Sequence, residues 1–164
     1  MKITELNKKL NESMSYDQIF KVVKASVEKS LRCHRAGLNL ILANIPNHIV
    51  AYHSLGSNSL VMNRTLLNIV KSRSKTHREL NIYLYLILMH EYLHSLGITD
   101  EREVRILVKK VASESLGSEN FDARMANGDL WSLYPEFRLI GPGKVGENFK
   151  IIKDFDLSST TYIR

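Results

Sequence analysis

The chain has few of the features that hold a protein together covalently or place it in a membrane. Cys33 is the one cysteine among 164 residues. A single cysteine excludes an internal disulfide and a cysteine-rich zinc site, and it favours a reducing compartment. The polar amino terminus lacks the apolar core of a secretory signal, and the apolar run at 82–89 is too short for a membrane span. We therefore expect a cytoplasmic protein that does not contact a membrane.

Repeats, low-complexity tracts and linkers of biased composition are also missing from the sequence. Because 44% of the 164 residues are hydrophobic, the chain can bury a sizeable core without dividing into separate units. We predict a single domain over residues 1–164.

Histidine and acidic side chains follow the apolar run directly, in the stretch HEYLHSLGITD that ends at Asp100. On a helix, residues four apart share a face, so His90 and His94 can present two imidazoles to one metal ion. Glu91 lies beside that pair, where it can hold a metal-bound water and accept its proton. The same residues could simply form the polar face of an amphipathic helix. However, 82–89 is apolar around the whole helix, and unpaired charge that continues a buried helix is costly, so we predict a metal site.

Signals at both ends define the helix that carries these residues. Thr76 and Glu79 have the spacing of a capping box, which predicts a helix over about 76–96. Gly97 can leave the helix with a positive φ and reverse the chain direction. A side chain at position 100 could then return to the same ion, which makes Asp100 a candidate third ligand.

The motif resembles that of the metzincin clan of zinc proteases, H-E-x-x-H-x-x-G-x-x-H, in the variant with a final aspartate that snapalysin-type enzymes use. It is also similar to H-G-x-x-H-x-x-G-x-D-H, the pattern of YbeY-type rRNA-maturation metalloproteins, except that Glu91 replaces a glycine. The resemblance covers only the helix and its exit. It implies that His90, His94 and Asp100 bind Zn²⁺ and that Glu91 is the general base. It also implies a methionine turn, for which Met125 is the candidate.

The third ligand stays open between several acidic residues. Asp100 could instead cap a following helix over about 100–116, because the residues after it also have capping-box form. In the gluzincin arrangement the third ligand is a glutamate on that following helix, which would favour Glu103, and Glu101 is a further alternative. The isolated histidines offer no partner at ligand spacing; these are His34, His48, His53 and His77.

The remaining patterns predict an α+β, single-domain zincin-like fold with the active-site helix packed on a small mixed β-sheet. Ser15 and Gln18 can cap a helix that Gly37 would end. In zincin-like folds the strand before the active helix forms an edge that can pair with an extended peptide, and we assign 58–63 to it. The irregular region after Gly117 would wall one side of the cleft. The expected helices are 16–34, 65–72, 76–96 and 100–116, and the expected strands are 38–45, 48–55, 59–62 and 149–155.

Positive charge is in excess, with 23 Lys and Arg against 17 Asp and Glu and a formal net charge of +6. Part of it gathers just before the metal helix, at Lys71, Arg73, Lys75, His77 and Arg78. Such a cluster can attract phosphate, which keeps an RNA-processing function open. No nucleic-acid-binding motif accompanies it and no aromatic residues interleave with it, so a solvated connector is the simpler interpretation.

These features together predict a zinc-dependent intracellular peptidase that acts on a peptide or protein substrate and holds one Zn²⁺ per chain. Imidazoles plus one carboxylate favour zinc, although iron, nickel or cobalt could fill the same site. Glu91 would accept a proton from the metal-bound water and return it to the leaving amine. Two alternatives remain, namely a YbeY-like metal-dependent RNA-processing endoribonuclease and a non-catalytic zinc-stabilised binding protein.

Overall fold

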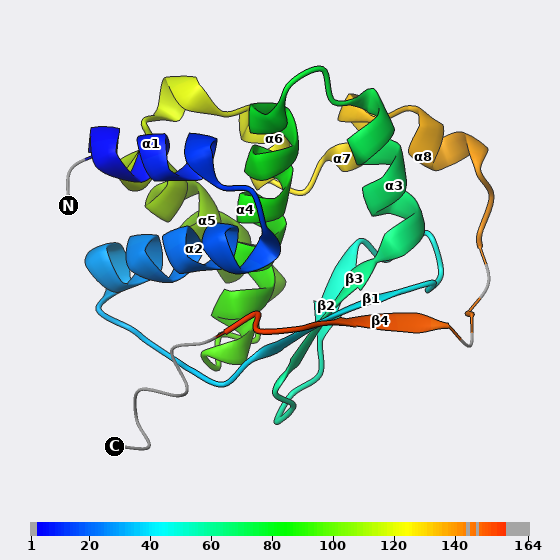
Figure 1. Ribbon diagram of the computed structural model, residues 1–164, viewed down its shortest axis with the longest axis horizontal. Coiled ribbons are helices and arrows are strands. Elements are labelled where there is room, and N and C mark those ends of the chain that lie inside the picture. Colours follow the sequence, from blue (N-terminus) through cyan, green and yellow to red (C-terminus); the bar gives the residue numbers. More distant parts are fainter. Residues whose placement is uncertain (1–2, 144, 147, 157–164) are drawn as a thin grey trace.

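The computed structural model describes residues 3–143, 145–146 and 148–156, and these form an α+β arrangement of helices around a small mixed sheet (Figure 1). The helices are α1 (Ile3–Glu12), α2 (Tyr16–Leu31), α3 (Arg64–Arg73), α4 (His77–Ser95), α5 (Glu101–Leu116), α6 (Ala123–Ala126), α7 (Leu130–Leu133) and α8 (Glu136–Leu139), with a 3-10 turn, η1, at Ser118–Asn120. The strands are β1 (Asn39–Ala43), β2 (Ala51–His53), β3 (Ser59–Asn63) and β4 (Phe149–Ile152). None of these helices combines the length and hydropathy that a membrane span requires.

Helix α4 is the central element of the core. It contacts α1, α2 and α5 on one side and strands β2 and β3 on the other (Figure 1). Its side chains from 81 to 89 are buried on every face, and Tyr83, Tyr85 and Tyr92 are among the largest fully buried side chains. Burial of this kind contributes roughly 1.5–3 kcal/mol per large apolar side chain. The core therefore fixes the position of α4 on all sides before its last turns reach the surface.

The ends of α4 lie close to the predicted bounds of 76–96. The Thr76 hydroxyl accepts a hydrogen bond from the Glu79 backbone N–H at 3.3 Å, and Gly97 follows the helix with a φ of 101°. The prediction was wrong at the end of α2, which stops at Leu31 and not at residue 34. There Arg32 adopts a left-handed conformation with a φ of 59°, so no glycine is needed to end the helix.

The sheet has the strand order β2-β3-β1-β4. Strands β1 and β3 run parallel, while β2 pairs antiparallel with β3 and β4 pairs antiparallel with β1. The assignment of 58–63 to the sheet edge was therefore wrong, because β3 is an interior strand and the edge strands are β2 and β4. Four of the five β3 residues are buried, as expected for a strand with neighbours on both sides, whereas β2 is half exposed.

Candidate metal centre

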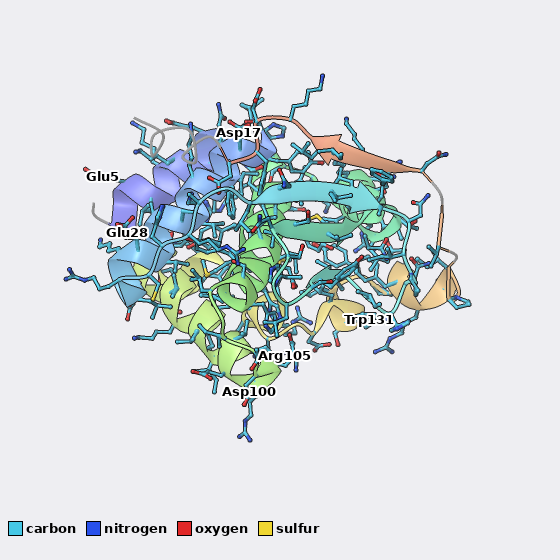
Figure 2. All side chains as sticks on the ribbon, turned by 90° about the horizontal axis from the view of Figure 1, so that it is seen from below. Glu5, Asp17, Glu28, Asp100, Arg105 and Trp131 are labelled. Carbon is cyan, nitrogen blue, oxygen red and sulfur yellow. The ribbon has the colours of Figure 1, made fainter. Side chains whose placement is uncertain are left out.

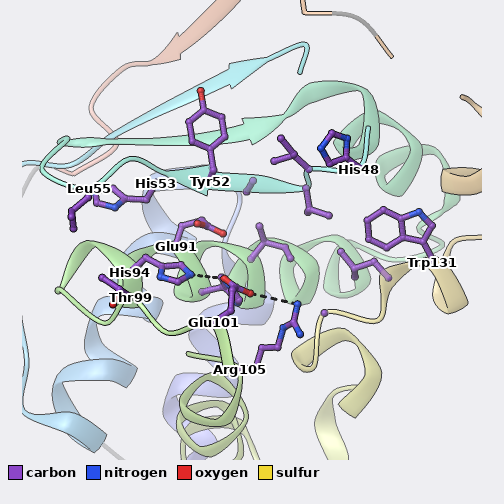
Figure 3. A pocket seen from close by; sticks show the side chains of 17 residues that line it. His48, Tyr52, His53, Leu55, Glu91, His94, Thr99, Glu101, Arg105 and Trp131 are labelled. Carbon is purple, nitrogen blue, oxygen red and sulfur yellow. Dashed lines mark hydrogen bonds and ion pairs between the residues drawn. The ribbon is translucent and has the colours of Figure 1, made fainter. Parts of the chain in front are cut away.

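His90 and His94 lie in the last two turns of α4, where the helix leaves the core and borders an open cleft. Figure 3 shows His94 beside Glu101 in this cleft. Both are half buried, and their ring centroids are 5.0 Å apart. The four-residue spacing puts the two rings one above the other on the same face of the helix. The structure thus brings together the two imidazoles that the motif predicted.

Glu101 is the acidic residue that the structure brings to these histidines. Its Oε1 atom is 2.7 Å from Nε2 of His90 and 2.6 Å from Nε2 of His94. Within the described part of the chain, these three residues form the one group of three or more His, Cys, Asp or Glu side chains whose donor atoms could share an ion. The three donor atoms all lie within 4.8 Å of one another.

Asp100 does not join this group. It is the N-cap of α5, and its Oδ1 accepts hydrogen bonds from the backbone N–H groups of Arg102 at 2.8 Å and Glu103 at 3.4 Å. These bonds turn the Asp100 carboxylate towards the first turn of α5. Figure 2 shows Asp100 at the outer end of α5. The carboxylate beside the imidazoles is therefore that of Glu101 and not that of Asp100 or the exposed Glu103.

The loop after α4 also orients His94. Gly97 turns the chain with its positive φ, and its N–H bonds to the carbonyl of His94 at 3.0 Å. The carbonyl oxygen of Ile98 then lies 2.8 Å from Nδ1 of His94. A carbonyl can only accept, so Nδ1 is the protonated nitrogen and the ring presents Nε2 to Glu101. This is the support that metal-binding histidines commonly receive, because it fixes the tautomer and leaves Nε2 as the ligand atom.

Glu91 is buried at the floor of the cleft, with 7% of its surface exposed, although it borders the open space. Burial raises its pKa to about 7; the charge of His94 opposes this shift and that of Glu101 adds to it. A carboxyl group with a pKa near neutrality can both accept and release a proton at physiological pH.

The pKa values of His90, His94 and Glu101 are shifted in different directions. Burial lowers the pKa of His90 in spite of its hydrogen bond to Glu101. Burial also tends to lower the pKa of His94, but the hydrogen bonds to Glu101 and Ile98 outweigh it and the pKa is raised. Burial tends to raise the pKa of Glu101, yet the hydrogen bonds from both histidines lower it. Two imidazoles that converge on one carboxylate oxygen create a place for a cation, either a proton or a metal ion.

The cleft has a volume of about 470 Å³ and three walls. Helix α4 forms the floor, β2 and the residues before it form one wall, and the start of α5 forms another. The third wall is the segment Gly128–Trp131, which confirms that the region after Gly117 borders the cleft. His48 and His53 also line it, and Nε2 of His53 donates to the carbonyl of Ser57 at 2.8 Å.

Met125 lies in α6, a single helical turn that packs against α4 and α5. It is buried in the hydrophobic core and does not line the cleft. The segment that the resemblance suggested as a methionine turn therefore forms a short helix.

The sequence pattern assigned no role to two residues of the cleft and left a third, Glu101, as a further alternative. Arg105 lies one helical turn after Glu101, and Trp131 lies in a segment whose pattern indicated only a loop. A signal for Glu101 and Arg105 was present, because a glutamate four residues before an arginine is a typical helical ion pair.

No protein-family model, curated protein or solved structure is significantly similar to this chain. The function is therefore inferred from the site itself.

Proposed function

We propose that the chain is a zinc-dependent peptidase in which His90, His94 and Glu101 hold the ion and Glu91 is the general base. The observation that carries this proposal is the convergence of two imidazole Nε2 atoms and one carboxylate oxygen beside a buried glutamate, at the floor of an open cleft. Compared with the ligand set expected from the motif, Glu101 takes the place of Asp100.

The donor set suits zinc. Two histidine nitrogens and one carboxylate oxygen are the protein ligands of many catalytic zinc sites, which keep a fourth position open. Ligand atoms about 2.0–2.2 Å from one ion lie within about 4.4 Å of each other, and the three donors here are already within 4.8 Å. Nδ1 of His94 is held by a backbone carbonyl, so its Nε2 is free to act as the ligand atom once its proton is displaced.

Glu91 supplies the proton transfer. Zinc at such a site provides a Lewis acid that makes water nucleophilic near neutral pH and stabilises negative charge on a carbonyl oxygen. The Glu91 carboxylate would take the proton of that water and deliver it to the amine nitrogen that leaves. Its place at the floor of the cleft, next to His90 in α4, supports this role.

Strand β2 supports a peptide substrate in particular. The backbone N–H of Asn63 bonds to the carbonyl of Val50 at 2.9 Å, which makes this a hydrogen-bonded pair of the antiparallel ladder. Because such pairs alternate along a strand, the N–H and C=O groups of Ala51 and His53 point away from β3. Both residues border the cleft, so an extended peptide can pair with this edge and pass over the metal centre.

The basic cluster gives little support to an RNA substrate. Arg73 binds the carboxylate of Glu136 with its Nη1 at 2.5 Å and 2.7 Å, and Arg78 bonds to Asn11 and to the carbonyl of Asn120. These guanidinium groups therefore contribute to contacts within the fold. The RNA-processing function and the non-catalytic zinc-binding protein remain alternatives.

A cleavage assay separates the three functions. We expect the chelator-treated protein to be inactive on a peptide mixture and to cleave it after one equivalent of zinc is added, with no effect on single-stranded RNA. Cleavage of RNA alone would favour the ribonuclease. Zinc binding with no cleavage of either substrate would favour the binding protein.

A further inference from the structure

Arg105 is a charged residue of the cleft to which the proposed mechanism gives no role. It extends from α5 into the space between Glu101 and Trp131 (Figure 3). Its Nη2 lies 3.5 Å from Oε2 of Glu101, the oxygen that faces away from the histidines. Half of the Arg105 side chain is exposed, and within the described residues Glu101 is its one acidic partner within 4 Å. Most of its five N–H donors therefore remain available to a ligand.

Gly128, on the opposite wall of the cleft, lies beside the Arg105 guanidinium. This glycine has a φ of 79°, and a Cβ atom at that position would come within 3.4 Å of Nε of Arg105. The backbone of the opposite wall thus runs directly along the guanidinium. Arg105 therefore borders a subsite of the cleft that lies between Glu101 and Trp131.

The charges of the cleft indicate which ligand suits this subsite. The acidic residues of the lining are Glu91 and Glu101, which together offset the two charges of a zinc ion. Arg105 then leaves the loaded cleft with an excess of positive charge. A guanidinium presents its donors as a planar fork that matches a carboxylate in a bidentate manner.

The direction of β2 places this subsite relative to the scissile bond. In Figure 3, His48 and Trp131 lie at one end of the cleft and Leu55 and Thr99 at the other. Strand β2 runs from the His48 end to the Leu55 end. We take the peptide to pair antiparallel with β2, as β3 does on the other side of that strand. It then runs the opposite way, so its residues C-terminal to the scissile bond lie on the Trp131 side.

We infer that Arg105 is a specificity-determining residue that binds a carboxylate of the substrate on the C-terminal side of the scissile bond. This inference rests on the proposed peptidase function for its placement, but carboxylate binding by the cleft can be tested without cleavage. The carboxylate can belong to an aspartate or glutamate side chain or to the C-terminus of the peptide.

The first experiment measures cleavage of a proteome-derived peptide library by the zinc-loaded protein, with sites mapped by mass spectrometry. We expect sites followed by acidic residues or by a nearby C-terminus to be enriched. In Arg105→Gln the ratio of kcat/KM for acidic over neutral sites should fall roughly tenfold or more, because hydrogen bonds to charged groups are strong. Arg102→Gln is the matched control, since it removes an exposed arginine from the same helix outside the cleft, and its ratio should match that of the wild type.

The second experiment measures binding in a Glu91→Gln background through the fluorescence of Trp131, the one tryptophan of the chain. Three probes of otherwise identical sequence are compared: an amidated peptide with one glutamate, its glutamine counterpart, and the glutamine peptide with a free C-terminal carboxylate. Tighter binding of the first identifies a side-chain carboxylate, and tighter binding of the third identifies the C-terminus. Either preference should disappear in Arg105→Gln.

The inference would be overturned by an acidic preference that survives in Arg105→Gln, or by the same affinity for all three probes. An equal loss of cleavage at all sites together with weaker zinc binding would also overturn it, because Arg105 would then only position Glu101. A wild-type protein that binds the acidic probe through Arg105 but cleaves no peptide contradicts the proposed function and leaves the carboxylate site standing.

Discussion

The two helices that meet at the candidate metal centre are built very differently. The end of α4 continues a helix that is buried on all faces, so His90 and His94 are positioned by the core. The start of α5 is exposed, and the Glu101 side chain is 54% exposed. Two donors are therefore preorganised by folding, while the third is brought in by a short loop and can adjust. A site built in this way can admit an ion after the chain has folded.

The largest effect is expected at the buried end of α4. Glu91→Gln should reduce the peptidase rate by roughly a hundredfold to ten-thousandfold, because the amide cannot accept a proton. The variant should still bind one zinc ion, which elemental analysis measures. Glu103→Gln is the control from the exposed side of α5 and should keep the wild-type rate. Normal peptide cleavage by Glu91→Gln would disprove the proposed mechanism.

The packing of α4 can be compared directly with that of α5 by truncating one side chain in each. Leu93, the residue before His94 in α4, is fully buried, and Leu93→Ala should lower the free energy of unfolding by about 2–5 kcal/mol. Ile106 on α5 is 61% exposed, and Ile106→Ala should change the free energy of unfolding by about 0.5 kcal/mol or less. Urea denaturation of the chelator-treated proteins measures both values. Similar losses at the two sites would remove the contrast between the helices.

The burial of Glu91 predicts a dependence of stability on pH in the metal-free protein. The folded state holds the Glu91 proton more tightly than the unfolded state does, since its pKa is about 7 and the ordinary value is 4.5. The stability that this proton provides is complete below pH 4.5 and is lost as the pH rises through 7. The loss should be on the order of 2–4 kcal/mol. We expect Glu91→Gln to lose less stability than the wild type between pH 5 and pH 8 in urea titrations, and parallel curves would contradict this.

The sequence predicted well the elements whose signals are local. The order of helices and strands from α2 to α5, both ends of α4, and the pairing of His90 with His94 followed from periodicity and caps. The short helices after Gly117 carry no such periodicity and were not predicted. The strand order was also missed, because it depends on which of β2 and β3 meets β1, a choice made by packing across the sheet.

The third donor shows the same limit at the level of one residue. Asp100 has the correct spacing in the motif and is also a strong N-cap, and local chemistry alone favours both roles. In the structure Asp100 caps α5, because it accepts hydrogen bonds from two backbone N–H groups of that helix. Glu101, the next residue, then faces the imidazoles. Because Asp100 caps α5, the neighbouring Glu101 is the carboxylate that meets the imidazoles.

The most direct test of the account is the zinc affinity of Glu101→Gln measured beside that of Asp100→Ala, by competition with a coloured chelator. We expect Glu101→Gln to weaken zinc binding by on the order of a hundredfold or more, since even residues that only support the ligands are worth about 10- to 100-fold. Asp100→Ala should lose about 0.5–2 kcal/mol of folding stability as a lost cap does, and should bind zinc nearly as the wild type does. The opposite ranking, with zinc lost in Asp100→Ala and kept in Glu101→Gln, would contradict the proposed ligand set of His90, His94 and Glu101.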